Sequence, residues 1–314
     1  MVTVRKRHDG PREIADVGFA PPVGIPTGVE VMSLAELRER AAVRMGRAGL
    51  HTPQRPTFHH LITLSSGSLR HMVDFTGYAL KPGSWLWVRP GQVQQWGDLS
   101  EAEGTLVLFE RDFVDPGTVA AARVDDHHAP VLKVPDTEDG HALAVAVDHL
   151  ALEFQALRGI PLEAHVAVLR HLLAALVLRL AQRTAPVGSP APEPGDTFVH
   201  FRDAVERDFA RTRRLEEYAQ ALGYSSRTLS RATLAGAGVA AKEFIDRRVI
   251  LEAKRLLAHG DLPASRVAAQ LGFTSATNFS KYFQQRTGQS PIAFRATVRG
   301  RSSESGGGDA PGTG

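Results

Sequence analysis

The sequence predicts a multi-domain α+β protein, with a β-rich N-terminal domain, a helical hairpin and an all-α C-terminal domain. Three observations support this division. Short strand-like segments separated by Gly and Pro-Gly turns fill residues 56–113, whereas helical periodicity begins near His141. Residues 185–196 contain four prolines and two glycines, which is typical of a stiff linker. Helical periodicity then continues from residue 197 to about residue 300.

Composition limits the classes of protein to consider. The 314 residues are too many for one typical domain, and 43% hydrophobic and 23% charged residues are ordinary for a globular protein. We find no run of about 20 apolar residues and no apolar segment behind the charged start at 1–10. The absence of cysteine excludes disulfides, cysteine-ligated metals and cysteine nucleophiles. We therefore expect a cytoplasmic protein without membrane contact.

Charge is distributed unevenly along the chain. Residues 197–300 contain 17 Lys and Arg against 9 Asp and Glu, a balance of +8, whereas the rest contains 20 against 25, a balance of −5. A basic C-terminal part beside an acidic N-terminal part indicates that the former faces a polyanion, although a solvated charged surface would give the same count.

The first half of the chain predicts a sensor-like domain behind a loose start. Residues 1–30 carry four prolines and little periodicity, so we expect them to be flexible. Residues 33–49 predict a helix with a Ser33 cap and Glu36 three residues later. The strand-like segments that follow are 58–64, 69–75, 84–88, 92–96 and 105–109, and their turns point to a small sandwich or barrel. The whole domain is predicted to span 31–184.

A barrel of this size has room for one small ligand. The side chains that could line its interior are Phe58, His60, Ile62, Trp85, Trp87 and Trp96. Ordinary core packing is the alternative for each of them, and a shift of one residue in strand register would exchange the two faces.

Two apolar stripes at helical spacing predict a helical hairpin over about 138–184. One stripe runs from Leu143 to Leu157 and the other from Val166 to Leu180, joined by a short turn at 158–161. The hairpin either covers its own barrel or forms a dimer interface, because the spacing suits both.

The C-terminal region, 197–300, contains the same motif twice. A helix with a small Ala219 ends at Gly223, and a second helix begins at a Ser cap, with Leu229 as its inward residue. About fifty residues later Ala268, a Leu-Gly-Phe turn at 271–273, a Ser/Thr cap and the inward Phe279 repeat this pattern. Residues 242–259 between them suit one long connecting helix closed by Gly260. Two such copies in register are far more specific than one.

Here the sequence resembles the arabinose-regulator (AraC-type) family of bacterial transcription regulators. The most specific stretch is GFTSATNFSKYFQQRTGQSPIAF, residues 272–294, and the resemblance covers roughly 197–299. The upstream strands resemble, more weakly, the cupin-like sensor domain of such regulators. The first unit departs from the family pattern: Thr233 stands where a buried aromatic is usual and Ala240 where Ser is usual, with Gly236 and Gly238 nearby. We expect this unit to be less stable or to bind more weakly.

By family position, the first exposed residues of each second helix would read DNA. The candidates are Ser226, Arg227, Thr228, Ser230 and Arg231 in the first unit, and Ala276, Thr277, Asn278, Ser280 and Lys281 in the second. An arginine can clasp guanine and Asn278 can read adenine bidentately, whereas Lys281 suits phosphate. Neutralising phosphate is the alternative role for both arginines.

Metal binding is the remaining possibility for the sensor domain. His59, His60 and His71 lie in neighbouring predicted strands, but adjacent His59 and His60 must point to opposite faces of one strand. Gln92, Gln94 and Gln95 stand where a metal-binding cupin would place a histidine. We therefore expect no metal and no cofactor, and we expect His127 and His128 to be solvated.

These features favour a transcription regulator, not an enzyme, which binds a double-stranded DNA operator and responds to a small-molecule effector. As a homodimer it would act as an activator that contacts RNA polymerase, by analogy with the family. The alternatives are a ligand-independent regulator whose barrel only mediates assembly, and a metal-dependent cupin enzyme with a DNA-binding tail. Residues 301–314 predict a disordered tail.

Overall fold

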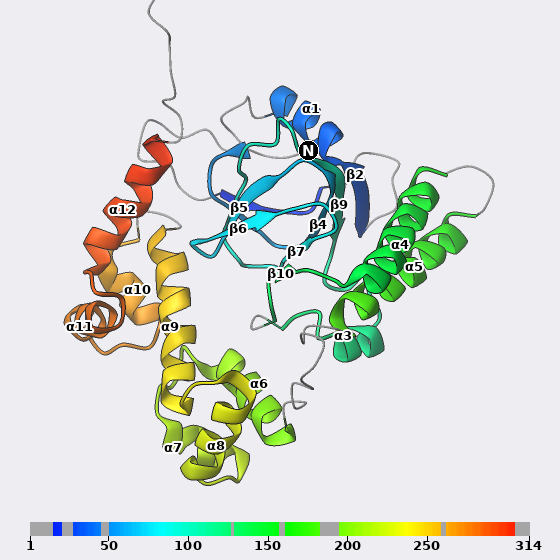
Figure 1. Ribbon diagram of the computed structural model, residues 1–314. Helices are drawn as coiled ribbons and strands as arrows, with labels where there is room; N and C mark the ends of the chain where they lie inside the picture. Colours follow the sequence, from blue (N-terminus) through cyan, green and yellow to red (C-terminus); the bar gives the residue numbers. More distant parts are fainter. Residues whose placement is uncertain are drawn as a thin grey trace, which may run out of the picture. The chain divides into compact units, whose positions relative to one another are not determined.

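The computed structural model describes residues 15–20, 28–44, 50–126, 129–156, 161–182, 195–258 and 262–304. Contacts divide the chain into two units, a first that ends at Thr184 and a second that runs from Ala185, and each is described by itself (Figure 1). The predicted linker up to residue 194, the tail from residue 305, the turn at 157–160, Gly49, Gly260 and the His127-His128 pair lie outside the described residues.

The first unit is β-rich and ends in two long helices. Its elements in chain order are β1 (Ala15–Val17), β2 (Val29–Ser33), α1 (Leu34–Arg44), β3 (Gln54–Pro56), β4 (His59–Ser66), β5 (Leu69–Val73), β6 (Thr76–Leu80), β7 (Trp85–Val88), β8 (Gln94–Gln95), β9 (Glu103–Phe109), α3 (Pro116–Ala122), β10 (Leu132–Lys133), α4 (Thr137–Gln155) and α5 (Leu162–Gln182).

The strands form two open five-stranded sheets, in the orders β1-β3-β8-β5-β6 and β10-β7-β4-β9-β2. Among the described residues neither sheet closes on itself, so the predicted barrel is not seen as such. Strand β1 pairs in parallel with β3, and it lies within the segment 1–30 that the sequence predicts to be flexible. Three residues in a proline-rich context give no periodic signal, so this strand is not predictable from the sequence.

The sheet β10-β7-β4-β9-β2 is buried on both faces, and its side chains alternate between two cores. On β4, β7 and β9, the residues Leu61, Trp87 and Val107 enter one core with α4 and α5. Their neighbours Ile62, Leu86 and Leu106 enter the other core, which includes residues of the opposing sheet. A strand buried on both faces reads as an unbroken apolar run, so its register cannot be taken from the sequence.

Helices α4 and α5 pack together and cover one face of this sheet. The predicted seams supply the contact, since Leu143, Val147, Leu169 and Leu173 are buried in the same core as the sheet residues. The segment 162–181 is long and apolar enough to cross a membrane, with mean hydropathy 1.6, which corrects the expectation that no such run exists. Its apolar seam is used within the unit's own core, which is a sufficient reason for its composition.

Helix α1 begins at the predicted capping box. Ser33 Oγ accepts a hydrogen bond from the Glu36 backbone N–H at 3.1 Å, and the Glu36 carboxylate accepts one from the Ser33 N–H at 2.7 Å. Both interactions satisfy N–H groups that a helix end leaves free, so this helix start was predictable from two residues.

A buried polar network lies between the two sheets. Gln94 Nε2 lies 3.1 Å from His60 Nδ1, and Gln94 Oε1 lies 3.1 Å from His71 Nε2. Burial lowers the pKa of His60 to about 3, with a further contribution from the nearby His71, and lowers that of His71 to about 4. Both rings are therefore neutral at physiological pH.

This network makes the first unit sensitive to acid. The folded-state pKa values lie below the ordinary value of 6.5, so the unfolded chain binds protons that the folded unit does not. Stability is fully present above pH 6.5 and falls as the pH drops towards 4, by about 1 kcal/mol per pH unit for each histidine. Urea unfolding followed by tryptophan fluorescence measures this, because all three tryptophans lie in the first unit. The His60→Gln/His71→Gln variant should show a shallower dependence; an unchanged slope would contradict the assignment.

Candidate DNA interface

The second unit is entirely helical among its described residues and contains two helix-turn-helix units. Its elements are α6 (Asp196–Asp208), α7 (Leu215–Leu222), α8 (Ser226–Ala237), α9 (Ala241–Ala258), α10 (Ala264–Gln270), α11 (Ala276–Thr287) and α12 (Pro291–Glu304). Helices α7 and α8 form the first pair and α10 and α11 the second, with the long α9 connecting them (Figure 1).

Both turns are built from the same hydrogen bonds. Gly223 and Gly272 have left-handed φ values of 71° and 68°. The N–H of the aromatic that follows each glycine donates to the carbonyl of the small residue in the first helix: Tyr224 to Ala219 at 2.9 Å, and Phe273 to Ala268 at 2.8 Å. Only glycine takes this conformation without strain, so the Leu-Gly-aromatic pattern fixes the turn.

Each second helix then begins at a serine cap. Ser225 Oγ accepts from the Thr228 N–H at 3.0 Å, and Ser275 Oγ accepts from the Asn278 N–H at 3.1 Å. The cap fixes where the helix starts, and therefore which residues form its first exposed turn.

The ten predicted DNA-contact residues all lie on α8 and α11. Arg227 and Arg231 are exposed one helical turn apart on α8. On α11, Thr277, Asn278 and Lys281 are exposed. Ser226, Thr228, Ser230, Ala276 and Ser280 are half-buried. The Asn278 carboxamide donates to Thr274 Oγ1 at 3.1 Å, so a base contact would exchange this hydrogen bond. Both sets thus lie within the first two turns of the second helices.

The two helix-turn-helix units fill their cores differently. On α11, Phe279 and Phe283 are fully buried. At the position of the second aromatic, α8 has Thr233, which is also fully buried and donates its hydroxyl to Leu229 O at 2.7 Å. Helix α6 packs closely on α8 nearby: a Cβ on Gly236 would lie 2.4 Å from the Phe198 ring, so the small glycine admits that ring. The first helix-turn-helix unit therefore depends on α6.

The second family departure also has a local physical effect. Ser290, in the second unit, accepts a hydrogen bond through its Oγ from the Ala293 N–H at 3.1 Å at the start of α12. Ala240, at the start of α9, has no hydroxyl for this bond. Losing a side-chain cap costs about 1 kcal/mol, which supports the expectation that the first helix-turn-helix unit is the less stable of the two.

In the first unit of the chain, the six predicted ligand-contact residues do not share one space. Phe58, Ile62 and Trp96 belong to the core between the sheets, and His60 stacks on Phe58 there with ring centroids 4.8 Å apart. Trp85 and Trp87 belong to the core under α4 and α5. Gln94, which bonds with His60, and His71, which bonds with Gln94, join the first set. Their link required the strand pairing of β5 with β8, which the sequence does not specify.

The three histidines considered for metal binding are also separated. His59 stacks on Phe109 in the helix-side core, whereas His60 faces the opposite side of β4, as expected for adjacent strand residues. No group of three His, Asp or Glu side chains among the residues searched could hold a metal ion.

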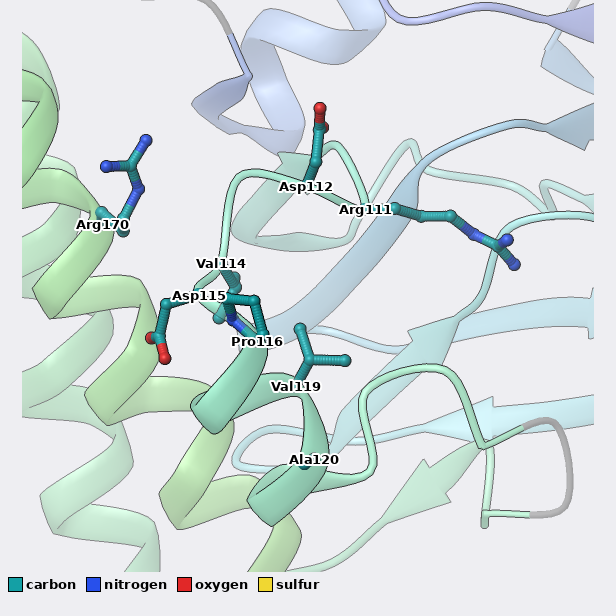
Figure 2. Close-up of a pocket in the computed structure, with 8 residues that line it drawn as sticks. All are labelled: Arg111, Asp112, Val114, Asp115, Pro116, Val119, Ala120 and Arg170. Atoms are coloured by element: carbon teal, nitrogen blue, oxygen red, sulfur yellow. The ribbon is translucent and has the colours of Figure 1, made fainter. Parts of the chain in front are cut away.

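A shallow pocket of about 540 Å³ lies beside α3 and α5, away from the predicted ligand residues (Figure 2). It is lined by Arg111, Asp112, Val114, Asp115, Pro116, Val119, Ala120 and Arg170. Both arginines are engaged, since Arg170 Nε donates to Phe113 O at 2.8 Å and Arg111 pairs with Asp125 at 3.5 Å. The pocket therefore offers mainly aliphatic surface.

Comparison with known proteins identifies the class of the second unit. Residues 218–297 match the family model described as "Helix-turn-helix domain". This part of the chain is therefore similar to helix-turn-helix domains.

Three curated relatives are HTH-type transcriptional regulators: the uncharacterized YfiF of Bacillus subtilis strain 168 (28% identity over 42% of this chain and 44% of its own), RipA of Corynebacterium glutamicum (36% over 26% and 24%), and the activator RhaS of Escherichia fergusonii (30% over 31% and 34%). The matches thus span less than half the length of each relative. They support the resemblance to AraC-type transcription regulators and the expectation that the chain is not an enzyme. They do not support the cupin-like sensor.

Several solved structures cover most of the chain. The crystal structure of ToxT from Vibrio cholerae O395 covers 86% of this chain and 96% of its own, at 14% identity and a TM-score of 0.40.

The turn glycines provide a matched test of how tightly the second turn is packed. A Cβ at Gly223 would meet nothing within 4 Å, whereas one at Gly272 would lie 2.1 Å from the Ala210 carbonyl oxygen. Gly223→Ala should cost about 1–2 kcal/mol for the left-handed backbone alone, and Gly272→Ala at least twice as much. Urea unfolding followed by circular dichroism at 222 nm measures both, while the tryptophan signal of the first unit should not move. Equal losses would show that the close approach to Ala210 is absent.

Proposed function

We propose that this chain is a sequence-specific DNA-binding transcription regulator that inserts α8 and α11 into successive major-groove segments of an operator. The observation that carries the proposal is the repeated turn, in which glycine, aromatic and serine cap position the start of each second helix in the same way. Recognition helices contact base edges with their first exposed residues. Two units on one connecting helix suit half-sites roughly 10 base pairs apart.

The residue types on the two helices define what each can contact. On α8, Arg227 or Arg231 would clasp guanine through O6 and N7, and the other would neutralise phosphate. On α11, Asn278 would read adenine, Ala276 or Thr277 would meet a thymine methyl group, and Lys281 would hold phosphate. Ser226, Thr228, Ser230 and Ser280 complete the proposed contact set.

Substitution of the two proposed base readers tests this assignment. Arg231→Ala and Asn278→Ala should each weaken binding to the selected operator. Asn278→Ala removes the proposed bidentate adenine contact, worth about 1–3 kcal/mol, and Arg231→Ala removes either the proposed guanine contact, worth about the same, or a phosphate contact. Affinity is measured by fluorescence anisotropy on a site selected from random DNA, with circular dichroism to show that the helices persist. Gln285→Ala, at an exposed position in the last turns of α11, serves as the control and should bind normally. Normal operator binding by both test variants would refute the assignment.

We further propose that the first unit, as the cupin-like sensor of the resemblance, binds a small-molecule effector between its sheets. With Gln94 donating to His60 Nδ1 and accepting from His71 Nε2, the other ring nitrogens are one N–H donor at His60 Nε2 and one acceptor at His71 Nδ1. Both are buried without a hydrogen-bond partner among the described residues. A neutral polar group on an apolar body, such as an amide or a carboxylic acid, would satisfy both.

A thermal-shift screen separates an effector-responsive regulator from a ligand-independent one. A true effector at about 100 times its Kd stabilises the folded protein by about 2.7 kcal/mol, visible as a higher melting temperature. The His60→Leu variant should lose that shift while retaining operator binding. If no neutral polar metabolite in a broad panel raises the melting temperature, the ligand-independent alternative is favoured.

The regulator is further proposed to be a cytoplasmic homodimer that activates transcription by contacting RNA polymerase. The seam of the α4–α5 hairpin is occupied by the sheet, but Val145, Leu152 and Leu162 remain exposed on the hairpin and could meet a second copy. Sedimentation of the full chain with and without operator DNA tests dimerisation.

A further inference from the structure

Arg213, in the loop between α6 and α7, contacts the turn of the second helix-turn-helix unit. Its Nη1 donates to Leu271 O at 2.7 Å and its Nη2 donates to Gly272 O at 3.0 Å. The guanidinium carbon lies 3.9 Å from the centroid of the Phe273 ring. One side chain of the α6–α7 loop therefore contacts three consecutive residues of the turn between α10 and α11.

The chemistry of this contact is specific to arginine. A planar guanidinium can donate to two carbonyls and stack on a ring at the same time, whereas an ammonium cannot. The two carbonyls belong to the C-terminal end of α10, where a positive charge is favoured. Because Arg213 is half-buried, the stacking contact on Phe273 is partly shielded from water.

The backbones of the α6–α7 loop and of the α10–α11 turn also meet at this point. A Cβ on Gly272 would lie 2.1 Å from Ala210 O, which is only possible if the α6–α7 loop and the second turn are in direct contact. The arginine therefore holds together two loops that are already closely packed.

A second set of contacts continues from the turn to the connecting helix. The Phe273 ring packs against Tyr282 of α11 with ring centroids 5.0 Å apart, and Tyr282 OH donates to Asp246 Oδ1 of α9 at 2.7 Å. Arg286 Nη2 donates to Asp246 Oδ2 at 2.6 Å. Burial alone would raise the pKa of Asp246, but hydrogen bonds from Lys242, Tyr282 and Arg286 outweigh it and hold that pKa below its ordinary value. The carboxylate is therefore charged and anchors the recognition helix α11.

We propose that Arg213 is a positioning residue that fixes the second recognition helix relative to the first, and thereby sets the half-site spacing that the protein accepts. Without Arg213, α9 and the Asp246 contacts remain, but the α6–α7 loop no longer holds the turn between α10 and α11. The consequence for DNA spacing rests on the proposed function, whereas the consequence for the protein alone does not.

The test on the protein alone uses the absence of cysteine from the chain. A Leu234→Cys/Gln285→Cys pair, at exposed positions on α8 and α11, accepts two spin labels, and pulsed electron resonance measures the distance distribution between them. Adding Arg213→Ala should broaden this distribution at unchanged helicity. Arg213→Lys should also broaden it, because the charge remains but the two-carbonyl contact does not.

Arg214→Ala is the matched control. It removes the same charge from the next position, where the side chain is 80% exposed and pairs only loosely with Glu217 at 3.8 Å. Its distance distribution should equal that of the parent pair. A distribution for Arg213→Ala as narrow as the parent's would overturn the proposal.

The DNA test measures affinity for two half-sites whose spacing is varied by single base pairs. The parent protein should prefer one spacing by tenfold or more, and Arg213→Ala should reduce this preference severalfold while binding a single half-site normally. A parent protein that binds no DNA refutes the proposed function, and the distance measurement still decides the role of Arg213. A retained spacing preference in Arg213→Ala would overturn the specificity role.

Discussion

The second unit depends on one backbone constraint, the left-handed glycine at the end of α7 and of α10. Each glycine ends its helix, brings the following N–H back to a small residue inside that helix, and leaves the next serine in position to cap a new helix. The direction and first turn of each recognition helix follow from this sequence of bonds. At Gly272 the constraint is doubled, because the conformation requires glycine and the contact with Ala210 excludes a side chain. The same turn is therefore both a local connector and the surface against which the α6–α7 loop packs.

Because these bonds are local, the helical second unit of the chain was predictable from the sequence, whereas much of the β-rich first unit was not. Ala219, Gly223, Ser225 and Leu229 act on neighbours within a few residues, so their spacing in the sequence determines their geometry. Helix α1, with Ser33 and Glu36, is predictable for the same reason. By contrast, strands β4, β7 and β9 are buried on both faces, and no alternation remains to indicate which residues face which core. The six predicted ligand-contact residues were therefore drawn from two different cores, and the pairing of His71 with Gln94 through neighbouring strands had no sequence signal.

The two helix-turn-helix units share a turn but not a core. The second helix-turn-helix unit fills its interior with aromatic rings from α11, whereas the first has a threonine at the corresponding position and packs Phe198 of α6 against Gly236 of α8. Thr233 is not a defect in itself, since its hydroxyl is satisfied by Leu229 O. The consequence is that α8 owes its packing to a helix that precedes the motif in the sequence. The departure from the family pattern is thus compensated by a longer-range contact, at the expense of making the first unit less self-contained.

The folded helical domain that carries both helix-turn-helix units must begin before residue 218. The match to the helix-turn-helix family model starts at residue 218, which leaves out α6 and Arg213. Yet Phe198 and Phe201 of α6 pack on Phe244 and Tyr218 within the first unit, and Arg248 of α9 is paired with Glu206 of α6 at 2.8 Å. Removing α6 would expose an apolar core and leave the mostly buried Arg248 without its α6 partner, which is a costly state. A segment that starts at residue 218 contains both recognition helices. It lacks the α6 residues that complete the core of the first helix-turn-helix unit, and it lacks Arg213, which contacts the turn of the second. The folded DNA-binding unit therefore begins with α6.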